Sequence, residues 1–568
     1  MPWPYHLVKL SKEQKHERRI LLDRYGFYAQ LSVLIPIVAY QSYALSRWAF
    51  LRYVRPRGVY AAVSDSSNRN AHTRTSSQLA TQKWRSVLWW LDDEVAPGWG
   101  LRQHWIAGAA WCLWMLFLCI HKTGDDYLHV TKRFGIIAAA QLPLHYMLAM
   151  KWRYSPLVFL FNTSHERLNP WHRLSGRLIT VFLCLHGAWY MNYYIQTESL
   201  HKLQSREVVI GLLAVALWAI LTSASLGIVR RWSYRVFYSL HIAIGVAILP
   251  VLFFHVSHLR LYVIEALCIF LIDRICRKID TFRGNVTITR IPQTNLLKLQ
   301  IAVPESKISR FQAAPGQHIY LSIPVNNTQR TKSLSSLHRF ISNPFSVADV
   351  SGRNVTLVVR ARAGPMTRAL DALAESPKAH VSIEGPLGGS RRFPNLGVDF
   401  DRVLLVAGGV GGTFAVPIYL DLREQLESEA KGLERLGLVW AARSAAEANW
   451  AVELEGADEL GRDENVQFYV TRGSSRTRRL NERYGSEDEG ALEMDELEVS
   501  PGDGIGTGEP GRPDLGQVVD NVFGHGDQER VAVLFCGPSG MARQLRRHVG
   551  QWVQRGRDVW WYEERFGW

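Results

Sequence analysis

The sequence predicts a multi-domain protein in which an α-helical membrane bundle is followed by a small antiparallel β-barrel and then by an α/β domain with a parallel sheet. Long apolar runs cluster in the first half of the 568 residues, and short alternating runs follow Ile279. From Val403 onward, compact apolar strands alternate with helix-like stretches. These periods are typical of membrane helices, half-buried strands and βαβ units, in that order. The length also exceeds that of one ordinary domain.

The charge balance favours a membrane protein. The formal net charge is +15, and the basic residues crowd the ends of the apolar runs. In a soluble chain such a balance would indicate nucleic acid as a partner, but this placement matches membrane orientation, so we expect a lipid bilayer and no nucleic acid. Five of the six cysteines lie in or beside apolar runs, and Cys536 lies in a strand-like run. The sequence therefore predicts neither a disulfide framework nor a CxxC metal pair.

We expect seven membrane spans, because several apolar runs approach the roughly 20 residues that a bilayer requires. The expected spans are residues 27–46, 105–121, 134–150, 171–194, 208–229, 236–255 and 259–275. Basic residues follow the first, third, fifth and seventh spans, which assigns those loops to the cytosol. The basic N-terminal tail opposes this rule, since the same topology leaves it outside. Residues 63–83 are rich in Ser and Thr and are predicted to form a flexible cytosolic loop.

Two apolar runs carry histidine pairs at the same spacing. His172 and His186 lie fourteen residues apart, and so do His241 and His255. On a helix this spacing leaves both rings on nearly one face, about 21 Å apart along the axis. Two such helices side by side would present one histidine pair near each membrane surface. We therefore predict ligation of two haems, an inner one by His172 and His241 and an outer one by His186 and His255.

Other polar residues of the spans are less specific. Two arginines have a functional and a structural interpretation, and four histidines have only a structural one. Arg173 and Arg177 could meet haem propionates, or they could simply be basic residues of a cytosolic helix end. Four further histidines have no partner at matched spacing, and we interpret them as interior or interfacial residues. They are His121, His129, His145 and His258.

The second half predicts two soluble domains. Residues 279–395 hold the short alternating runs of a barrel, and residues 396–568 hold the βαβ series. The first parallel strand ends in Gly408, Gly409, Gly411 and Gly412, where a helix begins. Glycines at such a junction let a pyrophosphate approach backbone N–H groups at a positive helix end. Residues 482–514 are acidic and rich in Gly and Pro, which predicts a disordered insertion.

Several motifs now resemble the ferric reductase family, the fungal ferric and cupric metalloreductases related to NADPH oxidases. The resemblance covers roughly residues 105–568. The paired histidines are similar to those of the family's two haem-bearing helices, and VAGGVGG is similar to its nicotinamide-nucleotide loop. The remaining motifs, in the family's order, are PGQH (Pro315–His318), NPFSVA (Asn343–Ala348), AGPMT (Ala363–Thr367), EGPLGG (Glu384–Gly389), CGP (Cys536–Pro538) and EERFGW (Glu563–Trp568).

The resemblance implies a ferredoxin-reductase-like module, with FAD on the barrel and NADPH on the parallel sheet. The implied FAD residues are Gln317, His318, Asn343, Pro344, Phe345, Ser346, Gly364, Thr367 and Trp568. Among them Phe345 would pack near the flavin, Ser346 would hydrogen-bond it, and Trp568 would stack on it until nicotinamide displaces it. Asn343 stands where His is usual, and Leu387 where an aromatic residue is usual, which puts flavin affinity and potential in question.

The implied NADPH site joins the glycine loop to the last parallel strands. Its residues are Gly408, Gly409, Gly411, Gly412, Cys536, Gly537 and Pro538, together with Arg443 and Arg472 at strand ends. The two arginines are candidates for the 2′-phosphate, because guanidinium groups suit phosphate; ordinary surface charge is the alternative. NADH remains the alternative to NADPH.

Residues 1–104 are expected to comprise the tail, the first span and the polar loop, and the resemblance implies a six-span haem domain over residues 105–278. Electrons would pass from cytosolic NADPH through FAD and two haem b groups to extracytoplasmic Fe(III) chelates or siderophores, with Cu(II) as another acceptor. The resemblance places the protein in the plasma membrane, with the vacuolar membrane as the alternative. An iron permease or ferroxidase would act downstream of it. The alternatives are a superoxide-generating NADPH oxidase and a haem-binding scaffold without reductase activity.

Overall fold

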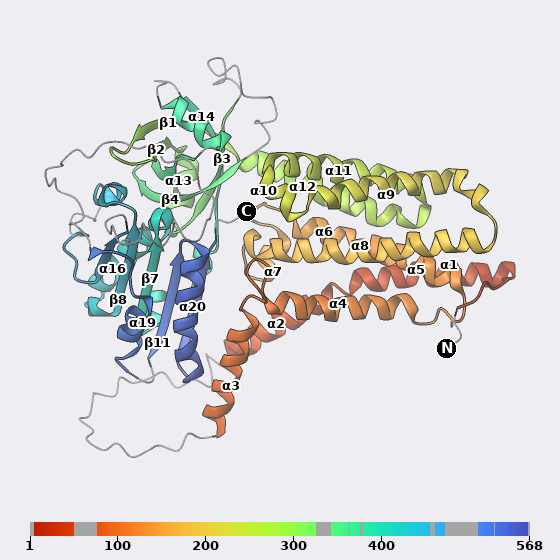
Figure 1. The fold of residues 1–568 in the computed structure, drawn as a ribbon, viewed down its shortest axis with the longest axis horizontal. Helices are drawn as coiled ribbons and strands as arrows, with labels where there is room; N and C mark the ends of the chain where they lie inside the picture. The colour runs from red at the N-terminus through yellow and green to blue at the C-terminus, as the bar shows by residue number, and fades with distance from the viewer. Residues whose placement is uncertain are drawn as a thin grey trace, which may run out of the picture. The chain divides into compact units, whose positions relative to one another are not determined.

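A computed structural model describes residues 5–49, 76–324, 342–362, 364–374, 379–454, 460–471, 509–526 and 529–565 (Figure 1). The chain divides into two compact units. One comprises Met1–Thr73 and Leu91–Asp280, and the other comprises Arg74–Trp90 and Thr281–Trp568.

The first unit is helical throughout. Its first helix starts at a capping box, in which the Ser11 hydroxyl accepts from the Gln14 N–H and the Gln14 side chain accepts from the Ser11 N–H. The longer helices are α1 (Lys12–Leu31), α2 (Leu34–Ala49), α4 (Arg102–Ile120), α5 (Tyr127–Ala140), α8 (His165–Gln196), α9 (Arg206–Ala224), α11 (Tyr234–His255) and α12 (Arg260–Asp280). The shorter ones are α6 (Leu142–Leu148), α7 (Pro156–Leu160), η2 (Leu200–Gln204), α10 (Gly227–Trp232) and η3 (Ser257–Leu259).

Three of the described helices, α4, α9 and α11, are long and apolar enough to cross a membrane by length and composition. They expose large apolar side chains, including Leu113 at 67% and Phe254 at 57%. Apolar surface on all sides of a helix is typical of contact with lipid. The other expected spans are also helical, but the first is interrupted at Ser32 and Val33 and the third at Gln141. The number of spans stays a prediction.

Two buried charged side chains of this unit make hydrogen bonds to backbone groups of other segments. The Arg133 side chain is fully buried; its Nη1 donates to the Leu118 carbonyl at 2.7 Å, and its guanidinium lies 3.5 Å from the centre of the Tyr25 ring. The Asp273 carboxylate accepts from the backbone N–H groups of Lys151 and Trp152. Because an unpaired buried charge would cost several kcal/mol, such contacts fix the packing of the helices.

The second unit begins with a closed six-stranded antiparallel barrel of order β1-β2-β5-β4-β3-β6, as predicted. Buried residues alternate along β1, which is the pattern of a strand with one face in a core. The strands are β1 (Phe282–Arg290), β2 (Leu296–Ala302), β3 (His318–Ser322), β4 (Asn343–Ser351), β5 (Asn354–Arg360) and β6 (Ala379–Leu387), with helices α13 (Glu305–Gln312) and α14 (Pro365–Leu373).

The α/β part has a parallel sheet of order β10-β9-β8-β7-β11-β12, which confirms the βαβ prediction. Successive residues of β7 alternate between two cores: Leu405 packs with α16, and Leu404 with α19 and α20. Helices therefore cover both faces. The strands are β7 (Arg402–Gly408), β8 (Leu436–Ala442), β9 (Val466–Val470), β10 (Glu509–Pro510), β11 (Arg530–Cys536) and β12 (Asp558–Glu564). The helices are α15 (Leu396–Asp399), α16 (Gly412–Ser428), α17 (Asn449–Val452), α19 (Leu515–Phe523) and α20 (Ser539–Gln554). The short 3-10 turns are η6 (Ser390–Arg392), η7 (Gly409–Gly411), η8 (Leu433–Arg435) and η9 (Ala445–Ala448).

Two expectations about loops were wrong in part. Within the acidic insertion, residues 482–508 lie outside the described residues, but Glu509 and Pro510 pair with β9 and Asp514 caps α19. Of the polar loop at 63–83, the described part is helical, because α3 spans Ser76–Leu91. The prediction rested on the Ser/Thr-rich composition of residues 63–83. It did not take into account the apolar, tryptophan-containing end of α3, which can pack against other elements.

Helix α3 packs on the last helix and strand of the sheet. The Arg85 guanidinium donates to the Asp558 carboxylate at 2.8 Å. Arg546 donates to the Trp89 carbonyl at 3.1 Å and stacks on its ring at 4.2 Å, while the Trp89 ring meets that of Trp561 edge to face at 5.9 Å. A polypeptide segment far away in the sequence is thus part of this unit.

The Trp89→Ala change should release α3 from the sheet, since it removes the cation–π and aromatic contacts and about 3 kcal/mol of packing. Hydrogen exchange of the α3 amides in the detergent-solubilised chain would then become markedly faster. Trp84→Ala is the matched control, because the Trp84 side chain is 59% exposed. Equal exchange in both variants would contradict this role for Trp89.

Candidate functional site

The inner histidine pair is brought together by two helices. His172 lies on α8 and His241 on α11, and their ring centroids are 6.1 Å apart with the ring planes at 75°. Metal–imidazole bonds are about 2 Å long, so this separation leaves room for one metal between two ring nitrogens. The sequence spacing alone could not show that these two side chains meet.

All four predicted ligands have their Nδ1 atoms hydrogen-bonded. His172 donates to the His145 carbonyl at 3.0 Å, His186 to the Thr131 carbonyl at 2.8 Å and His255 to the Glu207 carbonyl at 2.9 Å; the Nδ1 of His241 bonds the Ser225 hydroxyl at 2.9 Å. Because a carbonyl only accepts, Nδ1 carries the proton in the first three rings, and the lone pair is on Nε2. This arrangement is typical of metal-ligating histidines.

Glycines make room for the outer histidine rings. A Cβ on Gly135 would lie 2.7 Å from Cε1 of His186, and one on Gly211 would lie 2.7 Å from Cε1 of His255. The described residues contain no group of three or more metal-ligating side chains. Two imidazoles are the number that a haem iron needs from the protein, since the macrocycle occupies its other positions. The residues therefore fit two haem groups, and ligation stays a prediction.

His145 is a site residue whose importance the sequence did not reveal. Its ring stacks on that of His172 with centroids 4.1 Å apart, its Nδ1 bonds the Ser175 hydroxyl at 3.2 Å, and its carbonyl orients His172. His145 comes from α6, which carries no second histidine, so no spacing signal could have identified this contact.

The barrel brings the predicted flavin residues together on neighbouring strands. His318 pairs with Ser346, and Leu321 with Asn343, in the β3–β4 ladder, so Phe345 and Pro344 lie between them. The Gln317 side chain is only 3% exposed, and neither its amide oxygen nor its amide nitrogen has a hydrogen-bond partner among the described residues. A buried amide without partners favours a polar ligand at this position.

Two further flavin candidates mark the start of a helix. Gly364 is the N-cap of α14, and the Thr367 hydroxyl donates to the Arg362 carbonyl at 2.6 Å. The backbone N–H groups of a helix N-terminus can hold a phosphate. Trp568 lies outside the described residues, but β12 ends at Glu564, whose carboxylate is 3.9 Å from Nδ1 of His318. Leu387, the departure noted in the sequence, faces His318 across the β3–β6 pair.

The glycine loop is packed against the end of β11. A Cβ on Gly411 would lie 2.0 Å from the Cys536 carbonyl oxygen, and one on Gly408 would lie 2.5 Å from Cδ of Pro538. Gly409 has a positive φ of 55°, which favours glycine. These contacts join the carboxyl ends of β7 and β11, where ligands of open α/β sheets bind.

The charged groups around this loop differ in their burial. Burial raises the pKa of the Cys536 thiol well above its usual value, and the Glu564 and Glu563 carboxylates add to that shift, so the thiol is protonated at neutral pH. Arg443 is exposed directly after β8, as expected, whereas Arg472 lies outside the described residues.

Arg360 is a second residue that the sequence did not identify. Its Nη1 lies 2.8 Å from the Glu447 carboxylate, and its Nη2 would lie 3.4 Å from a Cβ on Gly409. The ion pair ties the barrel strand β5 to the loop after β8. A single arginine at a strand end gives no sequence signal of such a long-range contact.

The Gly411→Ala change should disrupt the junction of β7 and α16, because the added methyl group overlaps a backbone carbonyl that cannot move away. We expect the affinity for NADPH to fall at least about tenfold and the unfolding temperature to fall with it. Gly540→Ala is the matched control, since a Cβ there meets nothing within 4 Å. Calorimetric titration and thermal unfolding of the full chain would measure both; an unchanged G411A protein would contradict the close packing.

Two parts of the chain, one in the helical unit and one in the α/β part, match known protein families. Residues 134–252 match the family described as ferric reductase like transmembrane component, and residues 400–550 match the ferric reductase NAD binding domain. The probable metalloreductase AIM14 of Meyerozyma guilliermondii is 26% identical over 450 residues, covering 76% of this chain and 84% of that protein.

Two named ferric reductases are also similar. Ferric reductase transmembrane component 6 of Saccharomyces cerevisiae is 25% identical over 455 residues, covering 74% of this chain, and component 1 of Schizosaccharomyces pombe is 24% identical over 365 residues, covering 56%. The chain spans 58% and 61% of the lengths of these two proteins. The chain is therefore similar to fungal ferric reductases and metalloreductases, and its match to the ferric reductase like transmembrane component precedes its match to the NAD binding domain.

Proposed function

We propose that this protein is a transmembrane ferric reductase that carries electrons from cytosolic NADPH, through FAD and two haem b groups, to Fe(III) chelates outside the membrane. The observation that carries the proposal is the state of the four histidines. Each has its Nδ1 atom held by a carbonyl or hydroxyl group of another helix or turn, which directs Nε2 toward a metal. The names of the relatives support the ferric substrate.

The cofactors would supply the redox chemistry: hydride acceptance and separation into single electrons by the flavin, and one-electron transfer by the haems. The protein would hold and orient them. Helices α8 and α11 each carry an inner and an outer ligand, about 21 Å apart along the helix at 1.5 Å per residue. The lipid-exposed apolar side chains of these helices would exclude water from the path between the two levels.

The barrel would orient the flavin between strands and a helix end. The amide of Gln317 and the hydroxyl of Ser346 are the polar groups placed to bond it, and the N-terminus of α14 would receive its pyrophosphate. Asn343, which stands where the family usually has histidine, retains an amide donor. We infer that flavin binds with an altered affinity or potential rather than being lost.

The glycine loop would receive the nucleotide pyrophosphate, and Arg443 the 2′-phosphate. The protonated Cys536 thiol lies at the carboxyl end of β11, next to the loop, where it would pack against the nicotinamide without reacting. A plasma-membrane location would place the acceptor outside the cell, with an iron permease or ferroxidase downstream. Siderophores and Cu(II) are further acceptors of the same electron.

Acceptor reduction by washed membranes given NADPH tests this function. We expect Fe(II) formation from an Fe(III) chelate, followed with an Fe(II)-specific dye, to be unaffected by superoxide dismutase. Loss of the signal with dismutase, together with oxygen consumption, would instead indicate a superoxide-generating oxidase. Bound haem without electron transfer to either acceptor would favour a haem-binding scaffold.

The His186→Leu change should remove one haem, because only one imidazole of the outer pair would remain. The pyridine haemochrome absorbance per polypeptide should fall by about half, and Fe(III) reduction should be lost while NADPH still reduces the flavin. His201→Leu, at an exposed histidine of η2, is the control and should retain both haems. Full haem content in H186L would exclude the proposed pairing.

The Arg443→Ala change should weaken binding of NADPH, and not of NADH, since only NADPH carries the 2′-phosphate. We expect the KM for NADPH to rise about tenfold, as for the loss of one charged hydrogen bond. Arg547→Ala, at an exposed position of α20, should change neither KM. Equal effects of R443A on both nucleotides would remove Arg443 from 2′-phosphate recognition.

A further inference from the structure

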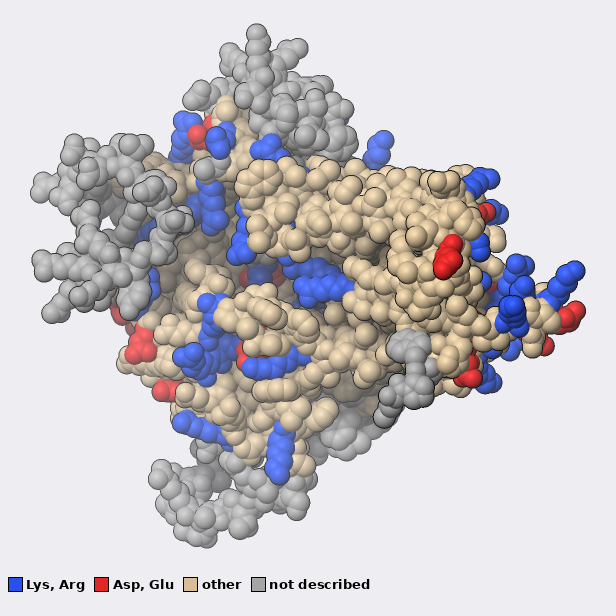
Figure 2. Space-filling view, turned by 45° about the vertical axis from the view of Figure 1, so that its right-hand side comes forward, with Lys and Arg blue, Asp and Glu red and all other residues tan. Residues whose placement is uncertain are grey.

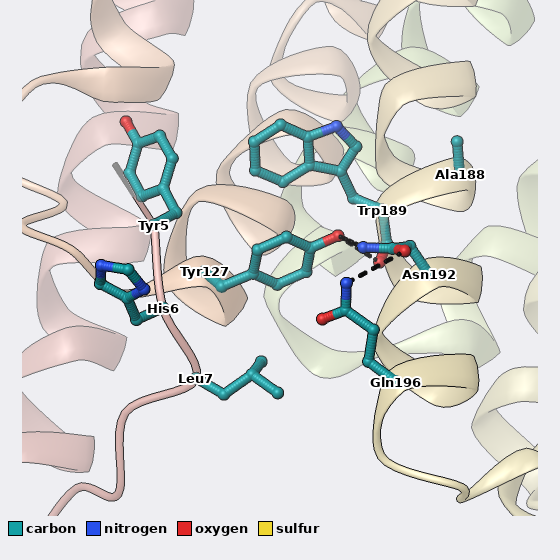
Figure 3. Close-up of a pocket in the computed structure, with 8 residues that line it drawn as sticks. All are labelled: Tyr5, His6, Leu7, Tyr127, Ala188, Trp189, Asn192 and Gln196. Carbon is teal, nitrogen blue, oxygen red and sulfur yellow. Dashed lines mark hydrogen bonds between the residues drawn. The ribbon is translucent and has the colours of Figure 1, made fainter. Parts of the chain in front are cut away.

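The segment that precedes α1 forms one wall of an open cavity of about 470 Å³ (Figure 3). Tyr127 forms its floor, and α8 its opposite wall. Its lining residues are Tyr5, His6, Leu7, Tyr127, Ala188, Trp189, Asn192 and Gln196. We infer that this cavity binds an anionic Fe(III) chelate next to the outer haem ligand His186, an inference that rests on the proposed function and names its substrate class.

A hydrogen-bonded series of side chains gives the cavity a polar wall. The Tyr127 hydroxyl donates to the Trp189 carbonyl at 3.0 Å, the Asn192 amide donates to the Tyr127 oxygen at 2.9 Å, and the Gln196 amide donates to the Asn192 oxygen at 3.4 Å. Figure 3 shows these three polar groups converging on one side of the cavity. Each amide nitrogen has a second N–H group that this series does not use, and a carboxylate of a chelate can accept from it.

The position of the cavity suits electron transfer. Trp189 and Asn192 follow His186 on α8 by three and six residues, which is about 4.5 Å and 9 Å along the helix axis. The Trp189 ring stacks on Tyr127 at 5.0 Å and meets Phe134 edge to face at 5.3 Å. Phe134 precedes Gly135, and the His186 ring packs against Gly135 at the position where a side chain would begin. Aromatic side chains therefore fill the short path from the ligand to the cavity.

The surrounding charge favours an anion. The start of α1 is basic, and it is attached beside the cavity through Arg18, which donates to the Lys122 carbonyl at 3.3 Å and lies 3.6 Å from the Asp126 carboxylate. Figure 2 shows Lys and Arg gathered at the right-hand end of the view, with fewer acidic residues. The exposed basic residues of this part of α1, Lys12, Lys15 and Arg19, outnumber its exposed acidic residues, Glu13 and Glu17. Such a surface raises the local concentration of anions, and it gives a reason for a basic tail outside the membrane.

Size and chemistry distinguish a chelate from smaller acceptors. Cavities of 300–1,000 Å³ hold ligands of drug size, and this one is far larger than O₂ or a bare metal ion needs. Its lining has one imidazole and neither a carboxylate nor a thiolate. Because a bare Fe(III) ion requires several such donors, the metal would arrive with its own ligands.

The electron balance is simple. Each chelated Fe(III) would gain one electron and become Fe(II), and the haem that His186 and His255 would hold would supply that electron. No bond to the protein forms or breaks. One NADPH gives up a hydride to become NADP⁺, so it reduces two chelates and one proton is released.

Binding of a redox-inert analogue separates this inference from the proposed function. Ga(III)–EDTA carries the same single negative charge as Fe(III)–EDTA and cannot be reduced under these conditions. Calorimetric titration of the detergent-solubilised full chain should detect its binding to the wild type. The Asn192→Asp change, which adds a negative charge to the cavity wall without changing its size, should weaken it about tenfold.

The matched control is Gln204→Glu, the same amide-to-carboxylate change at an exposed residue of η2 outside the cavity lining. It should leave the Ga(III)–EDTA affinity within about twofold of the wild type. The kinetics should agree: N192D raises the KM for Fe(III)–EDTA and not that for the cation hexaammineruthenium(III). The double change Lys15→Glu with Arg19→Glu should likewise raise the KM for Fe(III)–EDTA and not that for hexaammineruthenium(III).

The outcomes are distinguishable. If N192D and Q204E bind Ga(III)–EDTA equally, with haem absorbance intact in both, the cavity is not the chelate site, whatever the activity. No binding of Ga(III)–EDTA to the wild type would overturn the inference as well. Binding that N192D weakens, in a protein that reduces no ferric chelate, would support the cavity and overturn the proposed function instead.

Discussion

Placing imidazole rings among apolar helices constrains the whole first unit, because each ring has two nitrogens and neither can be left without a partner in lipid-like surroundings. The structure meets this constraint for Nδ1 with carbonyl or hydroxyl groups of residues 131, 145, 207 and 225. Those partners fix how far α5, α6 and α9 stand from α8 and α11. Gly135 and Gly211 then make room for the outer rings, which lie where a Cβ would stand. The orientation of the histidine rings and the packing of the helices therefore depend on the same contacts.

The second unit depends on a comparable close approach, in this case between backbones. Gly411 lies so near the Cys536 carbonyl that no side chain fits, and this contact aligns the ends of β7 and β11. The two parts of the unit are joined there as well. Arg360 of the barrel pairs with Glu447, and His318 lies near Glu564 at the end of β12. A flavin on the barrel and a nucleotide on the sheet would meet where these contacts already order the chain.

The N-terminal quarter of the chain contributes to both units. Residues 5–7 close a cavity beside α8, and α3 packs on the last strand and helix of the parallel sheet. Neither segment lies in the regions that match known families. By contrast, the helices that carry the paired histidines and the glycine loop are held by close packing that tolerates little change.

The sequence by itself determined the fold class and the types of candidate residue, because these follow from local periods. Two histidine pairs at one spacing, alternating strands from Phe282 and a glycine-rich strand-to-helix junction at Gly408 are all readable along the chain. Only the tertiary structure decided which groups meet. The Nδ1 partners of the histidines, the stacking of His145 on His172, the pairing of His318 with Ser346 and the docking of α3 all join residues far apart in sequence. Such contacts depend on side-chain packing between elements, and a single sequence carries no local signal of it.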